Sequence, residues 1–238
     1  MTTIKNRYRI QQEAYSEQLR RYMIKVFASM FIALAITGFT SASLFSTSLV
    51  DYLIPSNGDF TSIGWIAILA PLVFVLIFAT QIHKLSSGTA LTLLFIYSAL
   101  IGVSFVPTFY VYTGESIVRV FFITSATFLA MSIYGYTTRR NLLTYGSFLL
   151  MGVIGVLIAS LVNIFYQSSS LYFVISMITV LVFVGFTACD VQRLKKVFDS
   201  AGMYDRDKVS VVGALTLYMD FLNIFVGLLY LLGKKKNK

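Results

Sequence analysis

Long apolar stretches alternate with short polar connections along most of the chain. Seven such stretches fall at 26–50, 63–82, 91–112, 117–136, 142–166, 171–189 and 211–232. About 20 apolar residues are enough to cross the hydrocarbon core as a helix, which satisfies its own backbone hydrogen bonds in lipid. The alternation typical of membrane strands does not occur in these stretches. The pattern therefore predicts an all-α, polytopic membrane protein with seven transmembrane helices.

The segments outside these stretches are short and polar. Residues 1–22 form a basic leader without a core-forming pattern, residues 23–233 form the transmembrane domain, and residues 234–238 form a basic tail. Pro71 and Pro107 lie within apolar stretches, where we expect them to kink the helices.

Composition supports a membrane protein and excludes several other classes. The 238 residues are 57% hydrophobic and 12% charged, against about 25% charged in soluble domains. The single cysteine, Cys189, excludes an internal disulfide and a cysteine metal cluster, and the single histidine, His83, excludes a histidine metal site. The net charge of +9 comes from bases in the connections, so we interpret it as a topology signal beside anionic lipid and not as nucleic-acid binding.

The distribution of basic residues predicts the orientation. Bases precede the first stretch and occupy alternate later connections, while the intervening connections hold acids and only one base, Arg119. The positive-inside rule then places the N-terminus in the cytoplasm. Seven crossings would put the lysine-rich tail outside; alternatively, one segment is re-entrant and the tail is inside. We favour seven crossings because every stretch is long enough.

Two acids lie within the last two apolar stretches. Asp220 is in the middle of the last stretch, 211–232. Asp190 stands at the end of the stretch before it, directly after residue 189. A carboxylate in lipid costs several kcal/mol unless it is paired, protonated or facing water, so both are functional candidates. Alternatively, Asp190 caps its helix. A carboxylate at a helix C-terminus opposes the macrodipole, so Asp190 would then need a partner such as Arg193 or a proton shared with Asp220.

Small and polar residues recur with helical spacing around these acids. The last stretch carries Gly213, Thr216, Asp220, Asn223 and Gly227 on one face, and the stretch before it carries Ser176, Thr179, Thr187 and Asp190. Two such stripes predict either a narrow hydrated path or an interhelical hydrogen-bond network. Two neighbouring carboxylates cannot both ionise cheaply, and hard divalent cations such as Ca²⁺ prefer oxygen ligands. We therefore predict a pH-sensitive cation path with Asp190 and Asp220 as sensor and ion contacts, Thr216 and Asn223 beside them, and Arg193 as a partner.

The same residues carry a family resemblance. Four blocks are involved: LRRYMIKVFASMFIALAITGFTSA at 19–42, FFITSATFLAMSIYGYTTRRNLLTYGSFLLMGVIGVLIASLVNIF at 121–165, ACDVQRLK at 188–195 and LTLYMDFLNIFVGLLYLLG at 215–233. Together they resemble bacterial members of the Bax inhibitor-1 family. The resemblance implies a seven-helix protein of the bacterial inner membrane with a central last helix. It also implies a pH-dependent Ca²⁺ leak in which Asp190 and Asp220 are the proton-sensing pair, without an organic cofactor.

The chain departs from the family pattern near the second helix. Some members have a basic residue there that contacts the acid pair, whereas this chain has Thr80-Gln81-Ile82-His83-Lys84 and no arginine. His83 or Lys84 is the candidate substitute for this latch. The residues Cys189, Asn141 and Tyr230 also differ from the tyrosine, acid and arginine often found at their positions.

Two other functions compete with the leak. Two membrane aspartates are also the catalytic pair of presenilin-like proteases, but their GxGD and PAL blocks are missing, so we do not expect an enzyme. The stronger rival is a membrane modulator that binds other membrane proteins, such as a quality-control protease, or acts in stress or cell-death regulation. That role would rest on the basic leader and on the lipid-facing helix surfaces.

Overall fold

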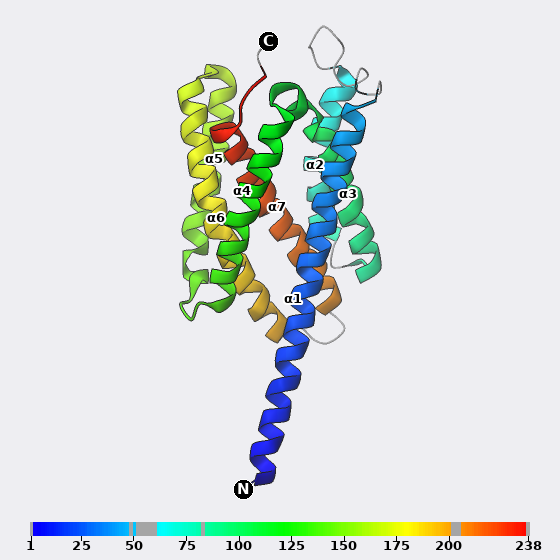
Figure 1. Ribbon diagram of the computed structural model, residues 1–238, viewed down its shortest axis with the longest axis vertical. Coiled ribbons are helices and arrows are strands. Elements are labelled where there is room, and N and C mark those ends of the chain that lie inside the picture. The colour runs from blue at the N-terminus through cyan, green and yellow to red at the C-terminus, as the bar shows by residue number, and fades with distance from the viewer. Residues whose placement is uncertain (1, 48–49, 51–60, 82–83, 201–205, 237–238) are drawn as a thin grey trace.

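The computed structural model describes residues 2–47, 50, 61–81, 84–200 and 206–236. The helices are α1 (Thr2–Phe45), α2 (Ser62–Gln81), α3 (Ser87–Val111), α4 (Gly114–Thr137), the short 3-10 helix η3 (Leu142–Tyr145), α5 (Gly146–Tyr166), α6 (Ser169–Ser200) and α7 (Arg206–Leu232). They run alternately up and down one bundle, with the two termini at opposite ends (Figure 1). Within the described residues, six helices are long and apolar enough to cross a membrane, and α2 is apolar over Gly64–Ile77. The protein is therefore a helical, polytopic membrane protein.

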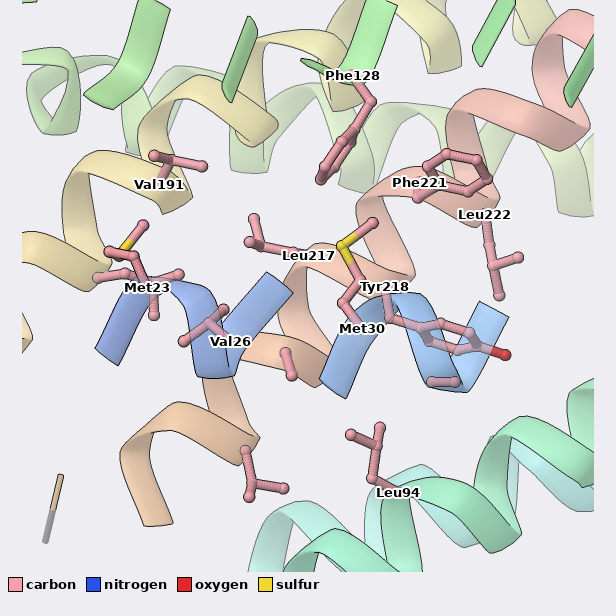
Figure 2. Close-up of a cluster of buried hydrophobic side chains, with 14 of the residues drawn as sticks. Met23, Val26, Met30, Leu94, Phe128, Val191, Leu217, Tyr218, Phe221 and Leu222 are labelled. Atoms are coloured by element: carbon pink, nitrogen blue, oxygen red, sulfur yellow. The ribbon is translucent and has the colours of Figure 1, made fainter. Parts of the chain in front are cut away.

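Helix α7 lies at the centre of the bundle. It packs against α1, α3, α4 and α6. Half of its most apolar stretch is buried, against 6% for the stretch that contains α5. Figure 2 shows Leu217 and Tyr218 of α7 surrounded by Met30, Leu94 and Val191 from three other helices. The last apolar stretch is thus the core helix, while α5 presents most of its surface outwards.

A buried hydrogen-bond junction joins α1, α3 and α7. The Oγ1 atom of Thr37 lies 2.9 Å from the Ser98 carbonyl oxygen and 2.7 Å from the Tyr218 hydroxyl. The neighbouring Tyr97 hydroxyl donates to the sulfur of Met219 at 3.1 Å. Buried polar groups must be paired to be tolerated in an apolar interior, so this junction specifies how the three helices pack.

Both prolines predicted to kink helices lie inside helices that continue past them. Proline has no N–H group, so Pro71 leaves the carbonyl oxygen of Ala67, four residues earlier, without its helical donor. Ser104 of α3 replaces that donor, because its Oγ donates to the Ala67 oxygen at 2.8 Å. A side chain of the neighbouring helix thereby makes the proline acceptable at membrane depth.

Three helices extend beyond their apolar stretches. Helix α1 begins in the leader and runs without a break into the first stretch, α6 continues to Ser200, and α7 already begins at Arg206. The leader also has core contacts, contrary to expectation: Leu19 and Tyr22 are buried, and the Tyr22 ring lies 5.2 Å from that of Phe198. Hydropathy marks only the apolar part of a helix, so it misses the more polar extensions that pack against each other beyond it.

The basic tail folds back onto the connection between α3 and α4. The Lys236 amide donates to the Val111 oxygen at 2.9 Å, and the Thr113 amide donates to the Lys234 oxygen at 3.1 Å. The Lys234 amide in turn donates to Ser116 Oγ at 2.7 Å. These bonds hold the described part of the tail at the end of the bundle opposite the N-terminus (Figure 1).

Candidate functional site

Asp190 and Asp220 meet inside the bundle, where α6 packs along α7. The two residues are 3% and 4% exposed, and their carboxyl groups lie close enough to interact electrostatically. The pair lies roughly 15–20 Å along the helices from the ends that the α6–α7 connection joins. The two acids thus form one buried, closely interacting pair.

Glycines allow the close approach of the helices that carry the acids. A Cβ atom added at Gly213 would overlap the Leu194 side chain, and one at Gly227 would lie 2.7 Å from Cγ2 of Val180. On the other side of α6, a Cβ at Gly135 of α4 would overlap the backbone of Ala188. Small residues at such contacts are a common packing device in membranes. Here the glycines of α4 and α7 let both helices pack closely against α6, at positions before and after Asp190.

Arg193 is the cation beside the pair. Its Nη1 atom lies 2.8 Å from Oδ1 of Asp190, one turn along α6, and its side chain is 50% exposed. The buried Oδ2 atom of Asp220 has no hydrogen-bond partner among the described residues. The alternative that Asp190 caps a helix end is wrong, because α6 continues to Ser200.

A cavity of about 320 Å³ lies on the Arg193 side of the pair, between α6 and α7. Its polar lining consists of Asp190, Arg193, Lys208 and Thr216. The Lys208 position was not predicted, although its spacing of eight residues from Thr216 places both on one face of α7. The cavity leads from Asp190 towards the basic end of the bundle.

Other predicted site residues do not reach the acids. Asn223 Nδ2 donates to the Met219 oxygen of its own helix at 2.8 Å. The hydroxyls of Thr179 and Thr187 likewise donate within α6, at 2.8 Å each. These three side chains satisfy their own helices, so they do not build the interhelical network that the stripes suggested.

The predicted latch residues do not contact the pair in the part of the chain that the structure describes. Lys84 is exposed beyond the end of α2, and no hydrogen bond or ion pair connects it to Asp190 or Asp220. His83 lies outside the described residues. The cation beside the acids comes from α6 itself, as Arg193.

The role of Gln192 was not predicted from the sequence. Its Oε1 accepts from the Leu142 amide at 2.7 Å, and its Nε2 donates to the Arg140 oxygen at 2.8 Å. Cys189 adds a contact from its Sγ to the Leu142 oxygen at 3.3 Å. These bonds attach the connection between α4 and α5 to α6 beside the acids. Nothing in a lone glutamine within a charged block indicates such a partner.

The donor set limits what kind of ion site the pair can form. Among the described residues, no group of three or more His, Cys, Asp or Glu side chains is placed to hold a metal ion. Ca²⁺ takes six to eight oxygen ligands in stable protein sites. Two carboxylates therefore supply fewer oxygen ligands than a stable Ca²⁺ site needs.

Comparison with known proteins assigns the chain to a family. Residues 19–237 match the family described as "Inhibitor of apoptosis-promoting Bax1". An uncharacterized protein of Rickettsia prowazekii is 41% identical over 99% of this chain and 96% of its own length. The "Inner membrane protein YbhL" of Escherichia coli K12 is 40% identical over 92% of this chain and 93% of its own length. A Borreliella burgdorferi protein is 41% identical over 91% and 93%. None of these three relatives has an enzymatic name.

Proposed function

The chain belongs to the Bax inhibitor-1 family, and from that premise we propose that it is a passive, pH-sensitive leak for Ca²⁺ or a related cation. The observation that carries the proposal is the contact between Asp190 and Asp220, two buried acids on adjacent helices. A buried acid pair is expensive in a membrane protein and typically lies on an ion or proton pathway.

Protons and cations compete for the same oxygen atoms. With one shared proton, the pair carries one negative charge, which Arg193 balances at 2.8 Å. Loss of that proton would leave two carboxylates side by side, and their repulsion would favour either separation of α6 from α7 or entry of a cation. The unpartnered Oδ2 atom of Asp220 is a ligand atom ready for that cation.

Arg193 is the gate in this proposal, in place of the expected latch on the second helix. The cavity that leads to Asp190 is lined by Arg193 and Lys208, whose positive charges repel an approaching cation. Half of the Arg193 side chain is exposed, so it has room to swing away from Asp190. When it leaves, the entrance loses a positive charge and the pair loses its counter-ion at the same moment.

We further propose that the protein lies in the bacterial inner membrane with its N-terminus in the cytoplasm. The name of the YbhL relative supports the membrane. The positive-inside rule supports the orientation, because the N-terminal end of the bundle carries bases such as Arg139, Arg140 and Lys195. Termini at opposite ends of the bundle favour seven crossings over a re-entrant segment (Figure 1). The expected partners are lipid, Ca²⁺ and protons, with no organic cofactor.

The test is Ca²⁺ flux into liposomes measured against pH. We expect flux of the wild type to change with pH and that change to disappear in Asp190→Asn and Asp220→Asn. The matched control is Asp207→Asn, since Asp207 lies on the same helix as Asp220 but is exposed and paired with Lys25. Flux that ignores both pH and the two substitutions would refute the proposal.

A second candidate function is regulation of another membrane protein by contact. The observation in its favour is α1, whose N-terminal part projects beyond the bundle (Figure 1). Residues 10–14 of this part are exposed, whereas Leu19 is buried. Deletion of residues 1–12 should therefore remove a docking element and leave the core intact. Loss of cellular activity in this deletion, with activity retained in Asp220→Asn, would favour regulation over the leak.

A further inference from the structure

A second cavity lies away from the acid pair, between α1, α3, α4 and α7. It has a volume of about 320 Å³, and its aromatic lining consists of Phe105, Phe109, Phe121, Phe122, Phe221 and Phe225. Helices α1 and α4 both pack on α7 but make few contacts with each other, and Figure 1 shows them in front of α7. The rim residues Val118 and Phe122 are 55% and 66% exposed. The cavity thus opens sideways, towards the hydrocarbon of the bilayer.

One polar group in this cavity lacks a partner. Ser41 lines the cavity and is 2% exposed, yet its hydroxyl has no hydrogen-bond partner among the described residues. Thr37, one turn earlier, is fully paired through the junction with Ser98 and Tyr218. An unmade hydrogen bond in an apolar site is costly. A ligand oxygen that reaches Ser41 would remove that cost.

A lysine lies at the end of the cavity nearest the tail. The Nζ atom of Lys236 donates to the Phe109 oxygen at 2.7 Å and lies 5.2 Å from the centre of the Phe45 ring. Phe45 stacks on Phe109 at 5.3 Å, and Phe109 lines the cavity. Phe45 follows Ser41 by one turn of α1. The Lys236 ammonium group, the Ser41 hydroxyl and the aromatic cavity therefore lie in that order along the bundle axis.

The described part of this end of the bundle carries more bases than acids. Among the described residues here, the bases are Arg119, Lys234, Lys235 and Lys236. The one described carboxylate at this end, Glu115, is already paired with Arg119 at 2.5 Å. The surface beside the cavity therefore suits an anionic group.

We propose that this cavity binds an anionic phospholipid of the adjoining leaflet. One acyl chain occupies the aromatic cavity, an ester oxygen of the glycerol accepts from Ser41, and Lys236 pairs with the phosphate. The lateral opening favours a lipid as the ligand, since a lipid can enter the cavity directly from the bilayer. This inference does not depend on ion conduction.

Gly38 offers a way to fill the cavity without disturbing its walls. It lines the cavity, and a Cβ atom added there would meet nothing within 4 Å. The same holds for Gly155 on α5, which is the matched control. Native mass spectrometry of the detergent-purified protein would measure binding of palmitoyl-oleoyl phosphatidylglycerol. We expect Gly38→Phe to bind this lipid about tenfold more weakly, because it displaces a few methylenes, and Gly155→Phe to bind as the wild type does.

The charge is tested with Lys236→Gln and with phosphatidylcholine that has the same chains. The control is Lys195→Gln, since Lys195 also donates to a carbonyl at 2.7 Å and lies over a tyrosine ring, at the other end of the bundle. Lys236→Gln should abolish the preference for phosphatidylglycerol, and Ser41→Ala should weaken both lipids.

Three results would overturn the proposal. The first is unchanged lipid binding in Gly38→Phe and in the smaller Gly38→Leu, each with wild-type thermal stability. The second is equal binding of the two lipids by the wild type. The third is a dimer that these Gly38 variants dissociate, which would make a second copy of the chain the occupant.

Discussion

The guanidinium of Arg193 lies 2.8 Å from the buried carboxylate of Asp190, while half of the Arg193 side chain is exposed. The ion pair thus spans the boundary between the interior and the cavity. An arrangement of this kind can be broken without unfolding the helix, because the cavity beside the half-exposed arginine leaves it room to move. Its removal should therefore separate the electrostatic role of Arg193 from the stability of the bundle.

Arg193→Gln should raise cation flux at every pH, because it removes both the counter-ion of Asp190 and a positive charge at the cavity entrance. Since the arginine is half-exposed but its partner Asp190 is buried, thermal unfolding in detergent should reveal a loss of about 1–3 kcal/mol. Arg119→Gln breaks the exposed pair with Glu115 and is the control. Equal flux in the wild type and Arg193→Gln would contradict a gating role.

Binding of Ca²⁺ to the acid pair should release a proton, because the cation and the proton occupy the same oxygens. Apparent Ca²⁺ affinity should consequently rise as pH rises. Titration calorimetry in two buffers of different ionisation enthalpy measures the protons released. Asp220→Asn should release none, and proton release that persists in this variant would place the Ca²⁺ contact elsewhere.

Gly135→Ala should destabilise the protein by about 1–3 kcal/mol, because the new Cβ would overlap the backbone of Ala188, which no rotamer change can relieve. Gly155→Ala provides the contrast, since nothing lies within 4 Å of its added Cβ. That control should be neutral or slightly stabilising, as alanine favours helix. Thermal unfolding of the two variants in the same detergent measures this difference in stability.

Ser104→Ala should cost about 1 kcal/mol, because the Ala67 oxygen that Pro71 leaves free would lose its donor. In a Pro71→Ala background the cost should shrink, since residue 71 then supplies its own N–H group to Ala67. A double-mutant cycle on unfolding free energies measures this coupling. Additive effects would show that Ser104 does not compensate for the proline.

How far the site was predictable depends on the kind of signal. The two acids were evident because a charge within an apolar stretch is conspicuous in any window, and Arg193 followed from its spacing of three residues. Gln192 and Ser41 gave no such signal. The bonds of Gln192 reach 50 residues back along the chain to Leu142, and the significance of Ser41 lies in a partner that is missing.

The sequence by itself determined the class of the protein, because hydropathy and helical periodicity are local properties that survive without knowledge of any contact. It determined the helices, the polar stripe on α7 and the acids as candidates. Only the tertiary structure decided that Asp190 meets Asp220, that Arg193 and not Lys84 faces them, and that Thr179 and Asn223 turn back to their own helices. Those outcomes depend on the separation and rotation of packed helices, which glycines such as Gly135 and Gly213 set through contacts with residues distant in the chain.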